Sequence, residues 1–293
     1  MICWILSRSH ASTQACLSAF CDCACSSVRG RRLLESYNLS VLPQNSLLHR
    51  GEQWQQMLEL SSVLLYKIGA NNLPTDLFPI ASGCLCEFRG HRLLLTASHV
   101  IKGDDVWRMA IKYIPGKGTE LLEVGPMAKL AWVDINGNKI GDIDLALTCV
   151  PKEVAPRYQR LDERNLNIVV DLAYTIHQVD FEQSPKRDVW YGFAGHTKPI
   201  LESHGSPPLP LPHIVESTTA FVGAIKYVAD ENGMHLFEIL GGHPGDEALN
   251  GCSGAPIIDE CGTVVALVCG GDVERNLIMG MSLRPYKSVA MTI

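Results

Sequence analysis

The sequence lacks any apolar stretch of the roughly 18 to 20 residues that a membrane-spanning helix requires. Basic residues are also in the minority, because 25 Lys and Arg stand against 31 Asp and Glu and leave a net charge of −6. Binding to a nucleic-acid backbone needs a clustered basic surface. We therefore expect a soluble protein with no membrane span and no nucleic-acid partner.

The sequence also lacks internal repeats and long helical patterns, which disfavours a propeller or a solenoid. One short helical pattern, with Trp54, Met57 and Leu58 at helical spacing, is followed by short apolar runs between Gly, Pro, Asn and Asp. These runs are CLCEF, RLLLTA, IDLALTCV, VWYGFA, TTAFVGAIKYV and TVVALVCGG. The pattern predicts an all-β fold, either a barrel or a sandwich, and ESHGSPPLPLPHIVES reads as a surface loop.

Cysteines are unevenly distributed, since five of the eleven lie in the first 25 residues. A chain of 293 residues with 46% hydrophobic residues can bury a large core and does not need disulfides to fold. We therefore expect mostly free thiols in the globular part, a reducing compartment and a cytoplasmic location. The thiols concerned are Cys84, Cys86, Cys149, Cys252, Cys261 and Cys269.

The N-terminal segment differs from the rest of the chain. MICWIL is too short for the apolar part of a secretory signal and has no basic residue before it. The Ser, Ala and Arg content faintly resembles a transit segment, and the Cys-x-Cys-x-Cys run at 21–25 faintly resembles a metal site. We favour a disordered or poorly ordered segment over residues 1–56, followed by a globular domain over 57–293.

A serine between small residues, Ser253 in NGCSGAPIID, is either a nucleophile or a residue of a glycine-rich turn. A serine nucleophile needs a base, and the base works best when a third group orients it. The stretch 251–255 nearly matches the G-x-S-x-G motif of α/β-hydrolases, but those enzymes place their histidine after the serine. No histidine follows His243, so that class is excluded and the order His, Asp, Ser stays open.

Two segments upstream fit this order. An apolar strand, Leu93 to Leu95, leads directly to His99 in TASHV and is expected to place the histidine at a cleft. In NKIGDIDLALTCV the alternation puts Asp142 and Asp144 on one face of a strand whose other face is apolar. An acid in such a strand is costly unless it is hydrogen-bonded.

Together these motifs resemble the trypsin-like (chymotrypsin-fold) serine peptidases. TASH is similar to their T-A-A-H segment, DLAL to D-x-A-L, and GCSGAP to G-x-S-G-G-P, while FPIASG and YGFAG also fit. The resemblance covers roughly residues 60–290 and implies two six-stranded antiparallel β-barrels with the active site between them. The first barrel would span about 60–165 and the second about 166–290.

Carried over to this sequence, the resemblance implies a role for each motif residue. His99 would be the general base, Asp144 the acid that orients it, and Ser253 the nucleophile, with Asp142 the less favoured acid. The backbone N–H groups of Gly251 and Ser253 would form the oxyanion hole. The implied function is a serine endopeptidase that hydrolyses peptide bonds through an acyl-enzyme and needs no metal or organic cofactor.

The substrate, a protein or peptide, would lie beside the strand 265–271. Cys269, Gly270 and Gly271 would then offer main-chain hydrogen bonds to it, as in strand addition. Glu247 precedes Ser253 by six residues, and an acid at the base of the primary pocket would favour Lys or Arg. The alternative for Glu247 is a solvated loop, PGDEALN.

Two departures from the secreted digestive members point to a branch of the family. Cys252 stands where those enzymes carry an acid before the serine, and Val100 stands where they carry a cysteine after the histidine. Both differences resemble the bacterial and intracellular branches, such as the Deg-like and glutamyl-endopeptidase-like peptidases. We expect Cys252 to pack in the core instead of acting as a nucleophile. A catalytically silent peptide-binding module with the same fold stays open as the alternative function.

Overall fold

The computed structural model describes most of the chain, and every structural statement below concerns the described part. The described residues are 47–67, 80–101, 106–115, 117–136, 138–162, 167–203 and 212–290. The Cys-x-Cys-x-Cys run and the rest of segment 1–46 lie outside them, as do the first two residues of FPIASG and the centre of the Pro-rich stretch.

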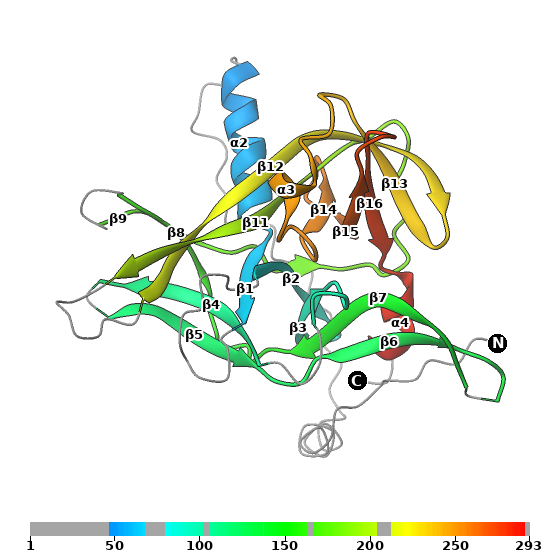
Figure 1. Cartoon of the computed structure of the whole chain (residues 1–293), viewed down its shortest axis with the longest axis horizontal. Coiled ribbons are helices and arrows are strands. Elements are labelled where there is room, and N and C mark those ends of the chain that lie inside the picture. Colours follow the sequence, from blue (N-terminus) through cyan, green and yellow to red (C-terminus); the bar gives the residue numbers. More distant parts are fainter. Residues whose placement is uncertain are drawn as a thin grey trace, which may run out of the picture.

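Strands dominate the fold, which confirms the all-β expectation (Figure 1). The helices are α2 (Leu47–Glu59), α3 (Asp246–Leu249) and α4 (Arg284–Ala290). The strands of the first half are β1 (Val63–Lys67), β2 (Ile80–Phe88), β3 (His91–Thr96), β4 (Trp107–Ile114), β5 (Gly118–Val124), β6 (Ala128–Val133), β7 (Lys139–Cys149), β8 (Arg157–Leu161), β9 (Ile168–Ala173) and β10 (His177–Gln178). Those of the second half are β11 (Trp190–Ser203), β12 (Pro212–Glu231), β13 (Met234–Ile239), β14 (Pro256–Asp259), β15 (Val264–Asp272) and β16 (Leu277–Ser282). None of the described helices is long and apolar enough to cross a bilayer.

The second half is a closed antiparallel barrel with the strand order β11-β12-β13-β16-β15-β14, as expected. Its interior is filled by alternating inward residues, among them Phe193, Ile225, Phe237 and Ile257, all fully buried. Burying a side chain of this size stabilises the fold by ~1.5–3 kcal/mol. The barrel begins at Trp190 and not near residue 166, because the segment before it pairs elsewhere.

The first half differs in strand count and closure from the expected six-stranded barrel. It is an eight-stranded sheet with the order β5-β4-β1-β2-β3-β7-β6, and β10 pairs in parallel with β2. No pairing among the described residues joins β5 to β6. The two ends of the sheet are instead joined by the chain itself through residues 125–127, where Pro126 has no N–H to continue a ladder.

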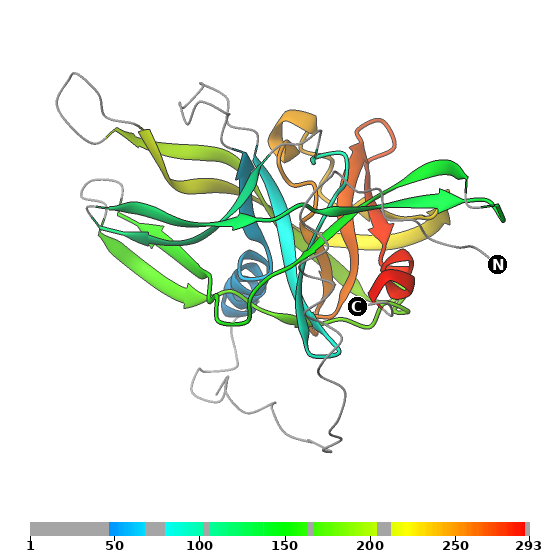
Figure 2. The ribbon, with the colours of Figure 1, turned by 90° about the horizontal axis from the view of Figure 1, so that it is seen from below.

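Two further elements were not predicted from the sequence. β8 and β9 form a two-stranded sheet of their own, so the strands before and after the expected boundary near residue 166 pair with each other. β11 and β12 continue past the barrel as a long ribbon, and β12 contacts β5 and β8 (Figures 1 and 2). Residues 212–217, expected in a surface loop, are therefore part of a strand.

Helix α2 confirms the helical pattern around Trp54 and shows that residues 47–56 belong to the fold. The Trp54 indole N–H donates to the carbonyl of Gly223 at 2.8 Å, and Leu58 is fully buried. Gly192 leaves room for both side chains, since a Cβ there would come within 2.7 Å of Leu58 and 2.9 Å of Trp54. The helix thus packs directly on the barrel.

We expect Trp54→Ala to lower the free energy of unfolding by roughly 3 kcal/mol, the lower end for loss of a large aromatic side chain. Gln55→Ala is the matched control, because Gln55 is exposed and its side chain bonds, among the described residues, to Glu59 of the same helix. That change should cost about 0.5 kcal/mol or less. Urea denaturation measures both. Equal losses would show that α2 does not dock through Trp54.

Two buried histidines make stability depend on pH. Desolvation lowers the pKa of both His177 and His196 to about 4, although His177 Nδ1 lies 3.2 Å from the carbonyl oxygen of Gly262 and His196 Nε2 lies 2.9 Å from that of Ser62. Both are neutral in the fold and titrate near pH 6.5 when unfolded. Between pH 6.5 and pH 4 the unfolded state therefore binds more protons than the folded state. The free energy of unfolding is highest above pH 6.5 and decreases as the pH falls from 6.5 to 4.

We expect the free energy of unfolding to drop across that interval by on the order of 3 kcal/mol for each histidine. His177→Gln should flatten the drop by about half. Denaturation series at several pH values test this, and an unchanged slope in His177→Gln would contradict it.

Candidate active site

His99 lies just beyond the end of β3, where the chain leaves the core. Leu94 and Leu95 are fully buried, whereas the His99 side chain is 46% exposed. The Thr96 hydroxyl donates to the carbonyl of Ser82 at 2.8 Å and ties the end of β3 to β2. The sequence therefore fixes the strand by its apolar residues and leaves the imidazole at the surface.

Asp144 on β7 is the acid that contacts His99. Its Oδ2 lies 2.7 Å from His99 Nδ1, and its Oδ1 accepts the His99 backbone N–H at 2.8 Å and faces the Ser98 hydroxyl at 3.2 Å. Its side chain is 24% exposed and lies between buried Ile143 and Leu145. The two N–H contacts from His99 therefore compensate the burial of this carboxylate, and the Ser98 hydroxyl is shared between it and the Ile143 carbonyl at 3.1 Å.

Asp142, the other acid on this face, is not part of the arrangement. It is 70% exposed and pairs with Lys139 at 2.5 Å. The two acids, which the alternation places on one face, therefore differ in their partners.

Ser253 comes from the barrel and completes a chain of contacts with the first half. Its Oγ lies 3.0 Å from His99 Nε2. Because a carboxylate only accepts hydrogen bonds, Nδ1 of a neutral His99 carries the proton and Nε2 presents its lone pair to the serine hydroxyl. The geometry matches that of a nucleophile, a base and an orienting acid.

The loop around Ser253 depends on glycines at 251 and 254. Their φ values are +100° and +90°, in the region that residues with a Cβ rarely adopt. A Cβ on Gly251 would overlap the carbonyl oxygen of His196, and one on Gly254 would overlap that of Ser82. Neither position accepts a larger residue without moving the loop.

Backbone N–H groups alternate between paired and free in this loop. Cys252 N–H donates to Leu249 O at 2.9 Å, and Gly254 N–H donates to Val268 O at 2.7 Å. Within the described part of the chain, the N–H groups of Gly251 and Ser253 have no protein acceptor. These two donors are available for a substrate oxygen beside Ser253 Oγ.

A cavity of about 360 Å³ opens beside Ser253. One wall is the loop around Gly251, and another is formed by Gly270 and Gly271 of β15. Asp246 and Glu247 of α3 also line it and are the charged residues among its described lining. His243 completes the lining, with Nδ1 accepting the N–H of Gly245 at 3.0 Å.

The end of β15 offers a partly open strand edge next to this cavity. β15 pairs with β14 as far as Leu267. From Gly270 onward, the only strand among the described residues that pairs with β15 is β16. Cys269 sits at a bulge between the two regions, with its thiol donating to Met279 O at 3.2 Å. Of the three residues expected to face a substrate, Gly270 and Gly271 line the cavity beside Ser253, whereas Cys269 is not part of its lining.

The thiols near the site are not activated. The six cysteines of the described part are free, and Cys252 is fully buried against Gly195. Desolvation raises the pKa of Cys252 to about 12. The pKa of Cys269 is also raised to about 12, first by desolvation and then by the charge of Asp144. Since the thiolate is the reactive form of cysteine, neither acts as a nucleophile at neutral pH.

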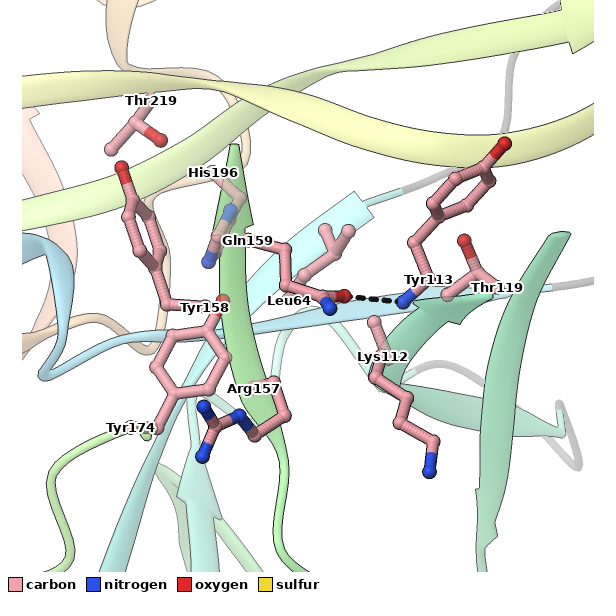
Figure 3. A pocket seen from close by; sticks show the side chains of 11 residues that line it. Leu64, Lys112, Tyr113, Thr119, Arg157, Tyr158, Gln159, Tyr174, His196 and Thr219 are labelled. Atoms are coloured by element: carbon pink, nitrogen blue, oxygen red, sulfur yellow. Dashed lines mark hydrogen bonds between the residues drawn. The ribbon is translucent and has the colours of Figure 1, made fainter. Parts of the chain in front are cut away.

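A second, smaller cavity of about 50 Å³ lies under the β11–β12 ribbon, near His196 (Figure 3). Gln159 closes it by accepting the backbone N–H of Tyr113 at 2.6 Å. The two cationic side chains in its lining are paired with acids outside the lining, Lys112 with Glu120 at 3.4 Å and Arg157 with Asp171 at 2.8 Å. Its lining does not include Ser253 or His99.

Two serines contact the site without having been predicted. Ser98 faces Asp144, and Ser82 contacts the loop around Ser253. Ser98 was visible beside His99 in TASHV, but nothing in the local sequence distinguishes Ser82 from an ordinary strand residue.

No protein-family model matches this chain, and no curated protein sequence matches it. Several solved structures are similar. Human heparin binding protein has 10% identity over 81% of this chain and 92% of its own, with a TM-score of 0.48. Neuropsin, a serine protease expressed in the limbic system of mouse brain, has 12% identity over 80% and 94%, with a TM-score of 0.43. A serine endoprotease from Yersinia pestis has 12% identity over 83% of this chain and 64% of its own, with a TM-score of 0.43. At these values the assignment of chemistry rests on the contacts of His99, Asp144 and Ser253.

Proposed function

We propose that this chain is a serine endopeptidase that hydrolyses peptide bonds through Ser253, His99 and Asp144. The observation that carries the proposal is the unbroken line of contacts, 2.7 Å from Asp144 to His99 and 3.0 Å from His99 to Ser253. These contacts join residues 45 and 154 positions apart in the sequence.

The proposed reaction has two halves. Ser253 Oγ attacks the scissile carbonyl carbon while His99 Nε2 takes the hydroxyl proton, and the negative oxygen of the tetrahedral intermediate accepts the N–H groups of Gly251 and Ser253. His99 then gives its proton to the departing amine nitrogen as the C–N bond breaks. Water, deprotonated by His99, attacks the acyl-enzyme and releases the acid product with Ser253 restored.

In this proposal the substrate binds as an added strand along Cys269, Gly270 and Gly271 and places one side chain in the 360 Å³ cavity. Glu247 and Asp246 would favour a Lys or Arg side chain there. Both acids are exposed, so solvent screening limits the preference.

The first test is chemical labelling and peptide cleavage. We expect a serine-directed phosphonate to label Ser253 in the wild type and to leave Ser253→Ala unlabelled and inactive. Asp144→Asn should lower kcat by about 10⁴, because the amide stabilises the wrong tautomer of His99. Asp142→Asn is the matched control with the same charge change two residues away on the same strand, and it should keep wild-type kcat.

Other outcomes would change the assignment. Peptide cleavage by Ser253→Ala would show that another residue is the nucleophile, and an equal loss in Asp142→Asn would remove Asp144 from its role. A wild type that binds peptides, forms no adduct and cleaves nothing would be a silent peptide-binding module.

The second test addresses Glu247. We expect Glu247→Gln to lower kcat/KM for peptides with Lys or Arg at the cleaved position by up to about fivefold, the value of an exposed ion pair. Peptides with Leu at that position should be unaffected. Glu153→Gln, an exposed acid outside the cavity, controls for net charge. Equal effects on both peptide classes would place Glu247 in a solvated loop without a role in recognition.

A further inference from the structure

Ser82 connects the two halves of the molecule at the loop that holds Ser253. It lies on β2 in the first half and is fully buried. Its hydroxyl donates to the carbonyl of Gly251 at 2.9 Å and accepts the backbone N–H of His196 at 2.9 Å. Both partners belong to the second half of the molecule, so this one side chain of the first half links β11, which carries His196, to the loop that carries Gly251.

The backbone of Ser82 adds two further bonds. Its N–H donates to the carbonyl of Ser253 at 3.1 Å, and its carbonyl accepts the Thr96 hydroxyl at 2.8 Å. Ser82 therefore binds the carbonyls on both sides of Cys252 and is itself anchored to the strand that leads to His99.

These bonds fix two peptide planes at both ends. The plane between Gly251 and Cys252 is held by Ser82 at its oxygen and by Leu249 O at its nitrogen. The plane between Ser253 and Gly254 is held by Ser82 N–H at its oxygen and by Val268 O at its nitrogen.

The free donors lie beside these fixed planes. The Ser253 N–H belongs to the peptide plane between Cys252 and Ser253, which lies between the two fixed planes. The Gly251 N–H belongs to the peptide plane between Asn250 and Gly251, which directly precedes the first fixed plane. With both neighbours fixed, the intervening plane has little freedom to rotate and its N–H keeps its direction.

We propose that Ser82 is a positioning residue of the oxyanion hole, acting through its hydroxyl on the Gly251 carbonyl. This inference rests on the proposed function. Preorganised donors stabilise a transition state because they need no reorientation when charge develops. Without the Ser82 hydroxyl, the Gly251–Cys252 plane loses one of its two restraints, and the Gly251 N–H no longer keeps its direction.

The test compares Ser82→Ala with Ser61→Ala. Ser61 is an equally buried serine whose hydroxyl bonds to Met57 O at 2.7 Å, away from the site, so both variants lose one buried hydrogen-bonded hydroxyl. We expect both to be less stable in urea. Ser82→Ala alone should lower kcat by about 10- to 100-fold with KM within about twofold, somewhat less than loss of a whole oxyanion donor.

A second readout isolates the oxyanion. A peptide aldehyde, whose adduct with Ser253 carries a tetrahedral oxygen, should bind Ser82→Ala more weakly in proportion to the loss in kcat. Ser82→Cys keeps a weak donor in nearly the same volume and should fall between wild type and Ser82→Ala. If Ser82→Ala does not fold, Ser82→Cys replaces it in the comparison of kcat and aldehyde affinity with the wild type and Ser61→Ala.

Two results would overturn the proposal in different ways. If Ser82→Ala or Ser82→Cys is destabilised like Ser61→Ala but keeps wild-type kcat and aldehyde affinity, the role of Ser82 is structural and the peptidase assignment still stands. If the wild type cleaves no peptide and takes no phosphonate, the peptidase assignment fails and the oxyanion role fails with it.

Discussion

The site depends on the seam between the first sheet and the barrel. His99 and Asp144 come from the sheet and Ser253 comes from the barrel, so neither half carries the full set of contacts alone. An apolar cluster crosses the seam and includes Leu95 of β3, Ile258 of β14 and Tyr286 of α4. A slip of about 1 Å across this surface would take the His99–Ser253 contact out of hydrogen-bonding range.

Short contacts at backbone level keep the seam in register. Gly254 lies so close to the Ser82 carbonyl that a residue with a Cβ would not fit at position 254. At the same place the Ser82 N–H donates to the Ser253 carbonyl. The Tyr286 hydroxyl adds a bond to the carbonyl of Ala146 at 3.2 Å, close to Asp144 on β7. Backbone groups have fewer ways to move than long side chains, so contacts of this kind fix position more tightly than an equal number of surface ion pairs.

Local patterns were enough to place some elements and not others. The order of TASH, DLAL and GCSGAP predicts which residues meet. The alternation in β7 predicts the burial of Ile143, Leu145 and Leu147 but not that of Ala146 on the opposite face. The choice between Asp142 and Asp144 came from the motif, because alternation alone puts both acids on one face. Ser82 escaped prediction because its partners are 114 and 169 residues away, and no local signal marks such a contact.

The pairing of the first half could not be predicted for the same reason. Which strands join β1 and β2, and whether the sheet closes, depends on contacts between distant segments and not on the composition of each strand. The Pro-rich stretch indicated a loop because proline removes a backbone donor, yet residues 212–217 lie on a two-stranded ribbon. Proline is tolerated at the first residue of a strand, which is where Pro212 stands.

In the proposed enzyme, the pocket and the oxyanion donors would share one piece of backbone. The helical turn that carries Glu247 ends at Leu249, and the Leu249 carbonyl accepts the Cys252 N–H in the loop that presents Gly251 and Ser253. The Asn250 N–H bonds back to the Glu247 carbonyl at 3.4 Å, so two successive hydrogen-bonded turns lead from Glu247 to Cys252, the residue before Ser253. Under the proposed function, a substrate side chain in the cavity would contact the same segment that carries the donors. In the proposed enzyme, binding energy gained in the pocket would act directly on the geometry of the reacting group.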